Sequence, residues 1–140
     1  MAADEQGRPM LETVTIDGRF CALVLRADFR GDGIEFFTQD EDTLQLGYMR
    51  RERGYAIRPH IHQSVPRTVE FTNEVLFIKS GRVKVDFYDN AQVYRESRVL
   101  SQGDVILLAE CGHGFEMIEE SEIIEVKQGP YAGAADKLRF

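Results

Sequence analysis

The sequence of 140 residues contains no tryptophan, only three histidines and only two cysteines. No stretch approaches the roughly 20 consecutive apolar residues that a membrane-spanning helix needs, so no such helix is predicted. Residues 1–10 are polar and lack an apolar core, which predicts that no secretory signal peptide is present. A Walker phosphate loop, a dinucleotide-binding glycine fingerprint and a nucleophile elbow are also absent from the sequence, which argues against three common classes of catalytic site.

Basic residues are outnumbered by acidic ones, 17 against 24, which gives a formal net charge of −7. Because like charges repel, neither nucleic acid nor an anionic membrane is predicted as a partner. A small anionic substrate remains open, since a local arginine cluster can outweigh the net charge. Cys21 and Cys111 are interpreted as reduced thiols of a cytoplasmic protein. A disulfide between them has no support in the sequence.

Short runs of β-forming residues separated by turn signals make up most of the chain. Asp17-Gly18 and Ser80-Gly81 each predict a hairpin, and a short helix is expected only within residues 133–138. The fold class is therefore all-β, with residues 1–10 as a flexible arm and residues 11–140 as a single domain. The predicted strands are Leu11–Ile16, 20–27, 34–38, 43–50, 69–79, Arg82–Tyr88, 92–100, Val105–Leu108, 114–118 and Glu122–Lys127, with residues 54–62 extended.

The three histidines are the residues best suited to metal chemistry. His60 and His62 are two positions apart in an extended segment, and such positions share one face of a strand, so both imidazoles can converge on one point. His113 follows the strand Val105–Leu108 through a tight turn. Neutral imidazole is a common metal ligand near neutral pH. An isolated H-x-H pair is nevertheless more often a surface or core feature, so its surroundings must decide.

Those surroundings resemble the first motif of the cupin superfamily, G-x5-H-x-H-x3–4-E-x6-G. Gly54 precedes His60 and His62 at the motif's spacing, and Glu74 stands at the motif's distance from Gly81. Eleven residues separate His62 from Glu74, where the motif has three or four, which predicts a longer loop. Glu70 lies inside that loop and shares strand parity with Glu74, so it remains a rival carboxylate.

The second cupin motif, G-x5-P-x-G-x2-H-x3-N, is matched less closely. Gly103 and His113 fit its first glycine and its histidine, while Ala109 replaces the proline and one residue is missing before the histidine. Met117 stands where the motif has asparagine. The resemblance covers residues 43–127 and implies a cupin double-stranded β-helix, that is, a jelly-roll β-barrel.

The resemblance further implies one divalent metal ion held by His60, His62, Glu74 and His113. Imidazole and carboxylate ligands suit Fe, Mn, Ni, Zn, Co and Cu alike, so the metal stays open. Such a set leaves coordination positions free, and cupins use it in dioxygenases, isomerases, epimerases and decarboxylases. Arg58 and Glu70 are the candidate catalytic residues, because Arg58 shares parity with the histidines and can pair with an anionic substrate.

The runs 74–89 and 123–131 resemble small cupin-fold metalloproteins found with bacterial surface-polysaccharide genes. This likeness implies an enzyme acting on a sugar or sugar-nucleotide. The alternatives are a non-catalytic, metal-dependent module that binds a sugar or carboxylate, and a structural cupin with an incidental metal. A homodimer is also expected, in which the apolar hairpin of residues 11–27 adds to a neighbour's sheet.

Overall fold

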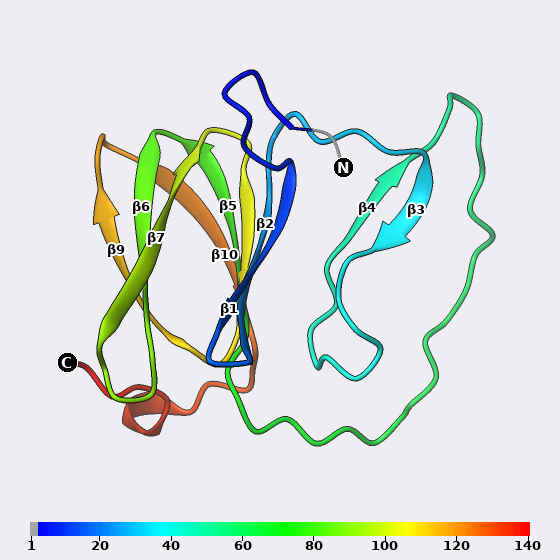
Figure 1. The fold of residues 1–140 in the computed structure, drawn as a ribbon. Helices are drawn as coiled ribbons and strands as arrows, with labels where there is room; N and C mark the ends of the chain where they lie inside the picture. Colours follow the sequence, from blue (N-terminus) through cyan, green and yellow to red (C-terminus); the bar gives the residue numbers. More distant parts are fainter. Residues whose placement is uncertain (1–2) are drawn as a thin grey trace. The chain divides into compact units, whose positions relative to one another are not determined.

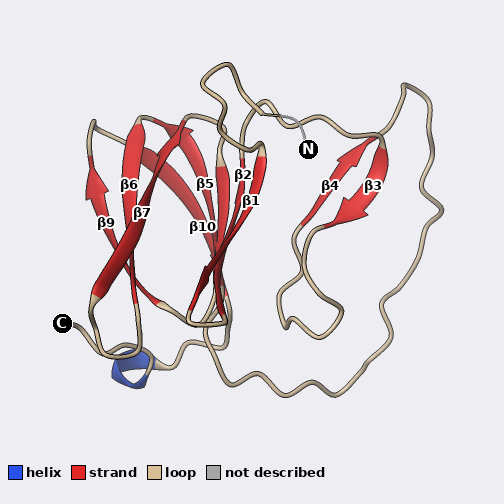
Figure 2. Cartoon of the chain, viewed as in Figure 1, coloured by secondary structure: helices blue, strands red, loops and turns tan. Residues whose placement is uncertain are grey.

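The computed structural model describes residues 3–140. Contacts divide this part of the chain into two compact units, one made of residues up to 29 together with 71–140 and the other of residues 30–70 (Figure 1). Within these described residues, strands dominate and the only helical element is the 3-10 turn Gly133–Ala135, labelled η1 (Figure 2). The all-β fold class is therefore confirmed, and the helix expected within residues 133–138 is a single turn.

The larger unit contains two antiparallel sheets. The five-stranded sheet has the order β1-β2-β8-β5-β10 and the three-stranded sheet has the order β7-β6-β9. Their strands are β1 Leu11–Ile16, β2 Arg19–Leu25, β5 Glu74–Ser80, β6 Arg82–Tyr88, β7 Tyr94–Ser101, β8 Val105–Leu108, β9 Gly112–Met117 and β10 Glu122–Lys127.

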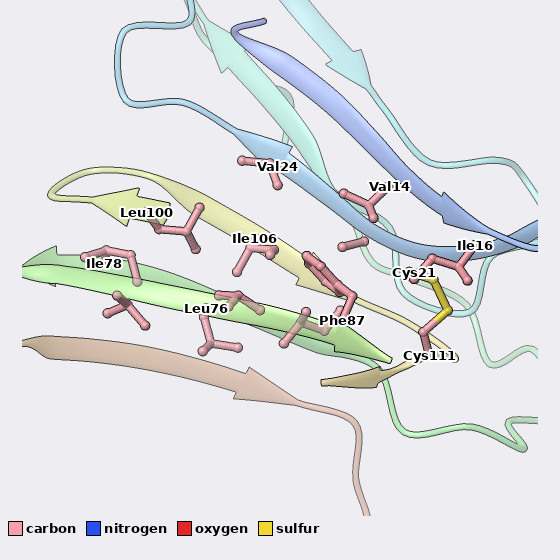
Figure 3. Packing of buried hydrophobic residues seen from close by; sticks show 14 residues of the cluster. Val14, Ile16, Cys21, Val24, Leu76, Ile78, Phe87, Leu100, Ile106 and Cys111 are labelled. Atoms are coloured by element: carbon pink, nitrogen blue, oxygen red, sulfur yellow. A yellow bond between two sulfur atoms is a disulfide. The ribbon is translucent and has the colours of Figure 1, made fainter. Parts of the chain in front are cut away.

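One hydrophobic core joins the two sheets (Figure 3). Alternate residues of β5 and β6 point into it, because side chains of a strand face opposite sides in turn. Leu76 and Ile78 come from the five-stranded sheet, and Val85 and Phe87 come from the three-stranded sheet; all four are buried. Alternation along each strand thus places one apolar face in the core.

The first hairpin forms where the sequence predicts it. Asp17 and Gly18 both have positive φ angles, 50° and 76°, as a two-residue turn of type I′ requires. β2 then pairs with β8 of its own chain. Of the two hairpin strands, only β1 is left at an edge of the sheet.

The smaller unit, residues 30–70, contains one short hairpin. Its strands β3, Gly33–Phe36, and β4, Gly47–Arg50, pair antiparallel with Ile34 opposite Met49. Residues 51–70 form neither strand nor helix, and the strand predicted to begin at residue 69 begins at Glu74. Pro59 and Pro66 lack the amide hydrogen that a sheet ladder needs, which agrees with the absence of strand pairing here.

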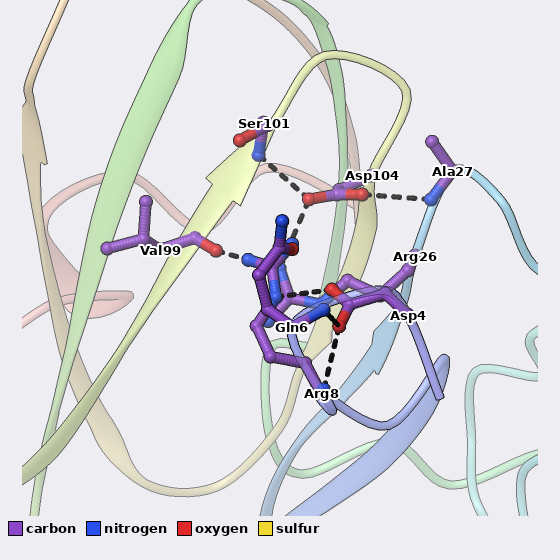
Figure 4. Close-up of polar contacts among 8 residues, drawn as sticks. All are labelled: Asp4, Gln6, Arg8, Arg26, Ala27, Val99, Ser101 and Asp104. Atoms are coloured by element: carbon purple, nitrogen blue, oxygen red, sulfur yellow. Dashed lines mark hydrogen bonds and ion pairs between the residues drawn. The ribbon is translucent and has the colours of Figure 1, made fainter. Parts of the chain in front are cut away.

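A buried ion pair closes one end of the larger unit (Figure 4). Arg26 Nη1 lies 3.1 Å from Asp104 Oδ2, and both side chains are only 7% exposed. The same nitrogen donates to the Val99 carbonyl, and Asp104 accepts from the backbone N–H groups of Ala27 and Ser101. Among the described residues, the Nε atom of Arg26 is buried without a hydrogen-bond partner.

Residues 3–10 form a hydrogen-bonded turn next to this ion pair in the close-up view. Asp4 accepts from the backbone N–H groups of Gln6 and Arg8 and pairs with the Arg8 guanidinium. Met10 accepts a backbone hydrogen bond from Arg26, which ties the turn to the end of β2.

The interpretation of the two cysteines as reduced thiols is wrong for this structure. Cys21 and Cys111 form a disulfide, which joins β2 to the turn between β8 and β9 (Figure 3). The two positions are 90 residues apart in the sequence but their Cα atoms are 4.8 Å apart, because β2 and β8 are neighbours in the sheet. Cys111 is therefore neither a free thiol nor available as a soft metal ligand.

Candidate functional site

Two predicted metal ligands meet at the end of the larger unit opposite the Arg26–Asp104 pair. Glu74 begins β5 in the five-stranded sheet, and His113 lies in β9 of the three-stranded sheet. Each points inward, since Glu74 has the parity of Leu76 and His113 is paired with Phe87. Glu74 Oε2 lies 3.9 Å from His113 Nε2, so the two sheets present one carboxylate and one imidazole to a common point.

A pocket of about 650 Å³ opens around these two side chains. It is lined by β5 and β10, by the β8–β9 turn, and by residues 136–140. Besides Glu74 and His113, its walls include Glu125 and Tyr88. This volume suits a small organic molecule, and the mixture of aromatic and charged walls is typical of a ligand site.

Burial raises the pKa of Glu74 above its ordinary value, and the neighbouring Glu125 raises it further through charge repulsion and a shared hydrogen bond. Lys127 and Lys137 act in the opposite direction. Burial also lowers the pKa of His113, because desolvation disfavours the imidazolium. His113 is thereby held in the neutral form that binds metals and accepts protons.

His60 and His62 lie in the smaller unit, and both are exposed. Their ring centroids are 5.3 Å apart, so the H-x-H spacing does bring the two imidazoles together. His60 Nδ1 lies 2.9 Å from the Arg58 carbonyl oxygen, and a proton on Nδ1 leaves Nε2 able to bind a metal. The structure thus contains two pairs of candidate metal ligands. His60 and His62 form one pair in the smaller unit, and Glu74 and His113 form the other in the larger unit.

The candidate catalytic residues Arg58 and Glu70 also belong to the smaller unit, where both are exposed. Of the two rival carboxylates, Glu74 is the buried one, only 7% exposed, and the one placed beside an imidazole.

Within residues 3–140, no three His, Cys, Asp or Glu side chains gather closely enough to hold a metal ion. The donor chemistry of each pair still fits a divalent transition metal, because neutral imidazole and carboxylate are its usual ligands. Glu74 and His113 can both reach an ion placed between them, as their separation of 3.9 Å indicates.

Five charged residues that line this pocket did not emerge from the sequence: Glu110, Glu125, Asp136, Lys137 and Arg139. Glu125 faces inward because β10 pairs with β5 so that Glu125 stands opposite Leu76. The sequence shows that Glu125 shares a strand face with Ile123 and Lys127. It does not show how β10 pairs with β5, and this pairing decides that the face points inward. Lys137 and Arg139 line the pocket from an irregular segment that carries no periodic pattern.

Comparisons with protein-family models, with curated proteins and with solved structures found no match for this chain. Among residues 3–140, no helix has both the length and the apolar character needed to cross a membrane.

Proposed function

We propose that this chain is a cupin-type metalloprotein that binds one divalent metal ion and acts on a small molecule in the pocket around Glu74 and His113. The observation that carries the proposal is the placement of these two residues. They come from different sheets, their reactive atoms are 3.9 Å apart, and they line a pocket of about 650 Å³.

The fold supports the proposal at a coarser level. Two antiparallel sheets around one core are the architecture from which a jelly roll is built. The motif residues from Gly54 to Gly81 and from Gly103 to His113 carry the finer assignment to the cupin superfamily, which rests on the sequence.

The proposed ligands are His60, His62, Glu74 and His113. That the two donor pairs share one ion is an inference from the first cupin motif, in which H-x-H and a glutamate bind together. A bound divalent ion would supply Lewis acidity to a substrate oxygen. The chain's own contribution is to supply three imidazoles and a carboxylate as ligands, with the Glu74 side chain buried.

The proposed activity is that of a metal-dependent enzyme of the isomerase, epimerase or dioxygenase class, with a sugar or sugar-nucleotide as substrate. Support for the substrate class comes from the resemblance of residues 74–89 and 123–131 to metalloproteins found with surface-polysaccharide genes.

Elemental analysis of protein purified without chelator tests the proposal. The wild type should carry close to one transition-metal ion per chain. His113→Ala and Glu74→Gln should each lower the occupancy strongly, because each removes a ligand. His60→Ala should do the same.

Glu70→Gln is the matched control, since it removes an exposed carboxylate at the rival position. Its occupancy should equal that of the wild type. Full occupancy in His113→Ala, or loss of metal in Glu70→Gln but not in Glu74→Gln, would contradict the ligand assignment. A wild type that takes up no metal would remove the proposal altogether.

A further inference from the structure

Residues 133–140, here called the strap, run along the rim of the pocket and are fixed at two points. At the first, Asp136 accepts a hydrogen bond from the Thr72 hydroxyl and pairs with Lys127, whose Nζ lies 3.3 Å from Asp136 Oδ2. The Asp136 side chain is only 9% exposed. This ion pair ties the strap to the inward face of β10.

The second fixed point is Phe140. Its ring contacts the Tyr88 ring edge-on, with the centroids 5.1 Å apart. Gly112 makes this approach possible, because a Cβ atom on Gly112 would stand 3.2 Å from the Phe140 ring. The strap is therefore packed against the backbone next to His113.

Between the two fixed points lie Lys137, Leu138 and Arg139. All three line the pocket and are exposed, and Lys137 and Arg139 are the two charged residues among them. Among the described residues, neither of these two cations forms an ion pair, in contrast to Lys127, which is paired with Asp136. Two unpaired cations thus lie at the rim of the pocket.

The charge of Lys137 acts on the centre of the pocket. Lys137 lines the same pocket as Glu74 and His113. A ligand beside Glu74 and His113 would therefore lie within the field of this cation.

We propose that the strap is the anion-recognition element of the pocket, with Lys137 and Arg139 binding a carboxylate or phosphate group of the ligand. The inference rests on the proposed function for the identity of the site. Lysine and arginine are the usual partners of such groups, arginine with two parallel hydrogen bonds.

Calorimetric titration with three probes of similar size tests the inference. The probes are glucose, which is neutral, glucuronate, which carries a carboxylate, and glucose 1-phosphate. At least one anionic probe should bind more tightly than glucose, and the better of the two identifies the anionic group. Each titration is run on metal-loaded and on chelator-treated wild type.

Lys137→Gln should weaken binding of the preferred anion about tenfold and leave the weaker binding of glucose unchanged. Arg139→Gln should act in the same direction. The matched control is Lys79→Gln, which removes an exposed cation that pairs with Glu122 on the outside of the sheet. Circular dichroism checks that each variant retains the wild-type fold.

Equal affinity for glucose and both anions, no binding of any probe, or anion affinity unchanged by Lys137→Gln would each overturn the inference. Metal content is measured in the same samples, so the two proposals fail separately. A chain without metal that still prefers an anion through Lys137 would keep the strap inference and remove the metal. A metal-loaded chain whose anion affinity is unchanged by Lys137→Gln would keep the metal proposal and remove the strap inference.

Discussion

The two ends of the larger unit each bury a charged group, but in opposite ways. At one end, the Asp104 carboxylate accepts hydrogen bonds on both oxygens and pairs with Arg26 across 3.1 Å. At the other end, the Glu74 carboxylate faces a second carboxylate, Glu125, and a neutral imidazole. β8 spans the distance between them, since Asp104 precedes it and Leu108, its last residue, is paired with Glu74.

The comparison distinguishes two kinds of buried charged group, one that has an opposite charge beside it and one that does not. A buried charge that finds its opposite charge and its hydrogen bonds stabilises one conformation. A buried carboxyl group placed beside another carboxyl group raises the free energy of the metal-free protein, and such an arrangement is typical of ligand sites. The Asp104 end holds the sheets together, and the Glu74 end is where we propose that a metal and a ligand bind.

The largest expected effect comes from breaking the closed end. Asp104→Ala should lower the free energy of unfolding by about 3–5 kcal/mol, because it leaves Arg26 buried without its counter-charge. Urea denaturation under non-reducing conditions measures the change. Asp32→Ala is the control, since Asp32 pairs with Arg50 but its side chain is 95% exposed, and it should cost less than about 1 kcal/mol. A similar cost for both variants would contradict the contrast between buried and exposed pairs.

The disulfide should have the next largest effect, because it fixes the backbone two residues before His113. Replacing both Cys21 and Cys111 with alanine should lower the free energy of unfolding by about 2–4 kcal/mol, as expected when a long loop loses its cross-link. The thermal midpoint of the wild type should fall when reductant is added, while that of the double variant should not respond. If the thermal midpoint of the wild type did not change when reductant is added, the two sulfur atoms would not be bonded.

The smallest effect concerns the open end in metal-free protein. Burial, and then Glu125, raise the pKa of Glu74 above 4.5, so the folded chain keeps a proton that the unfolded chain loses as the pH rises past this value. Wild-type stability should therefore decline with rising pH relative to Glu74→Gln, which does not titrate. Urea denaturation of both proteins with chelator, between about pH 4 and about pH 7, measures this difference.

Glu120→Gln provides the baseline, because Glu120 is exposed. A difference between Glu74→Gln and the wild type that stays constant over the same pH range would contradict the unfavourable burial of the Glu74 charge.

Much of the fold could be predicted because its signals are local. The bounds of Leu11–Ile16, Arg82–Tyr88, Val105–Leu108 and Glu122–Lys127 agree with the structure, since alternation and turn residues mark both ends of each strand. The segment of residues 54–62, also expected to be extended, acquires no partner strand. Local pattern predicts that a segment is extended, whereas pairing depends on distant residues.

The candidate site was predictable only in part for the same reason. The two motifs identified Glu74 and His113 as ligand positions, and the structure brings these two residues together. Glu125 and Lys137 reach the pocket through a strand register and an irregular segment, neither of which leaves a sequence signal. The Cys21–Cys111 pairing likewise depends on β2 lying next to β8, a tertiary fact.

The disulfide also changes the covalent topology of the chain. It closes a ring whose two cysteines are 90 positions apart, and this ring contains all of residues 30–70. A protease that cuts once within residues 51–70, which belong to no strand or helix, therefore opens the ring without releasing a fragment. The nicked protein would keep its mass on a non-reducing gel and separate into two pieces once the sulfur–sulfur bond is reduced.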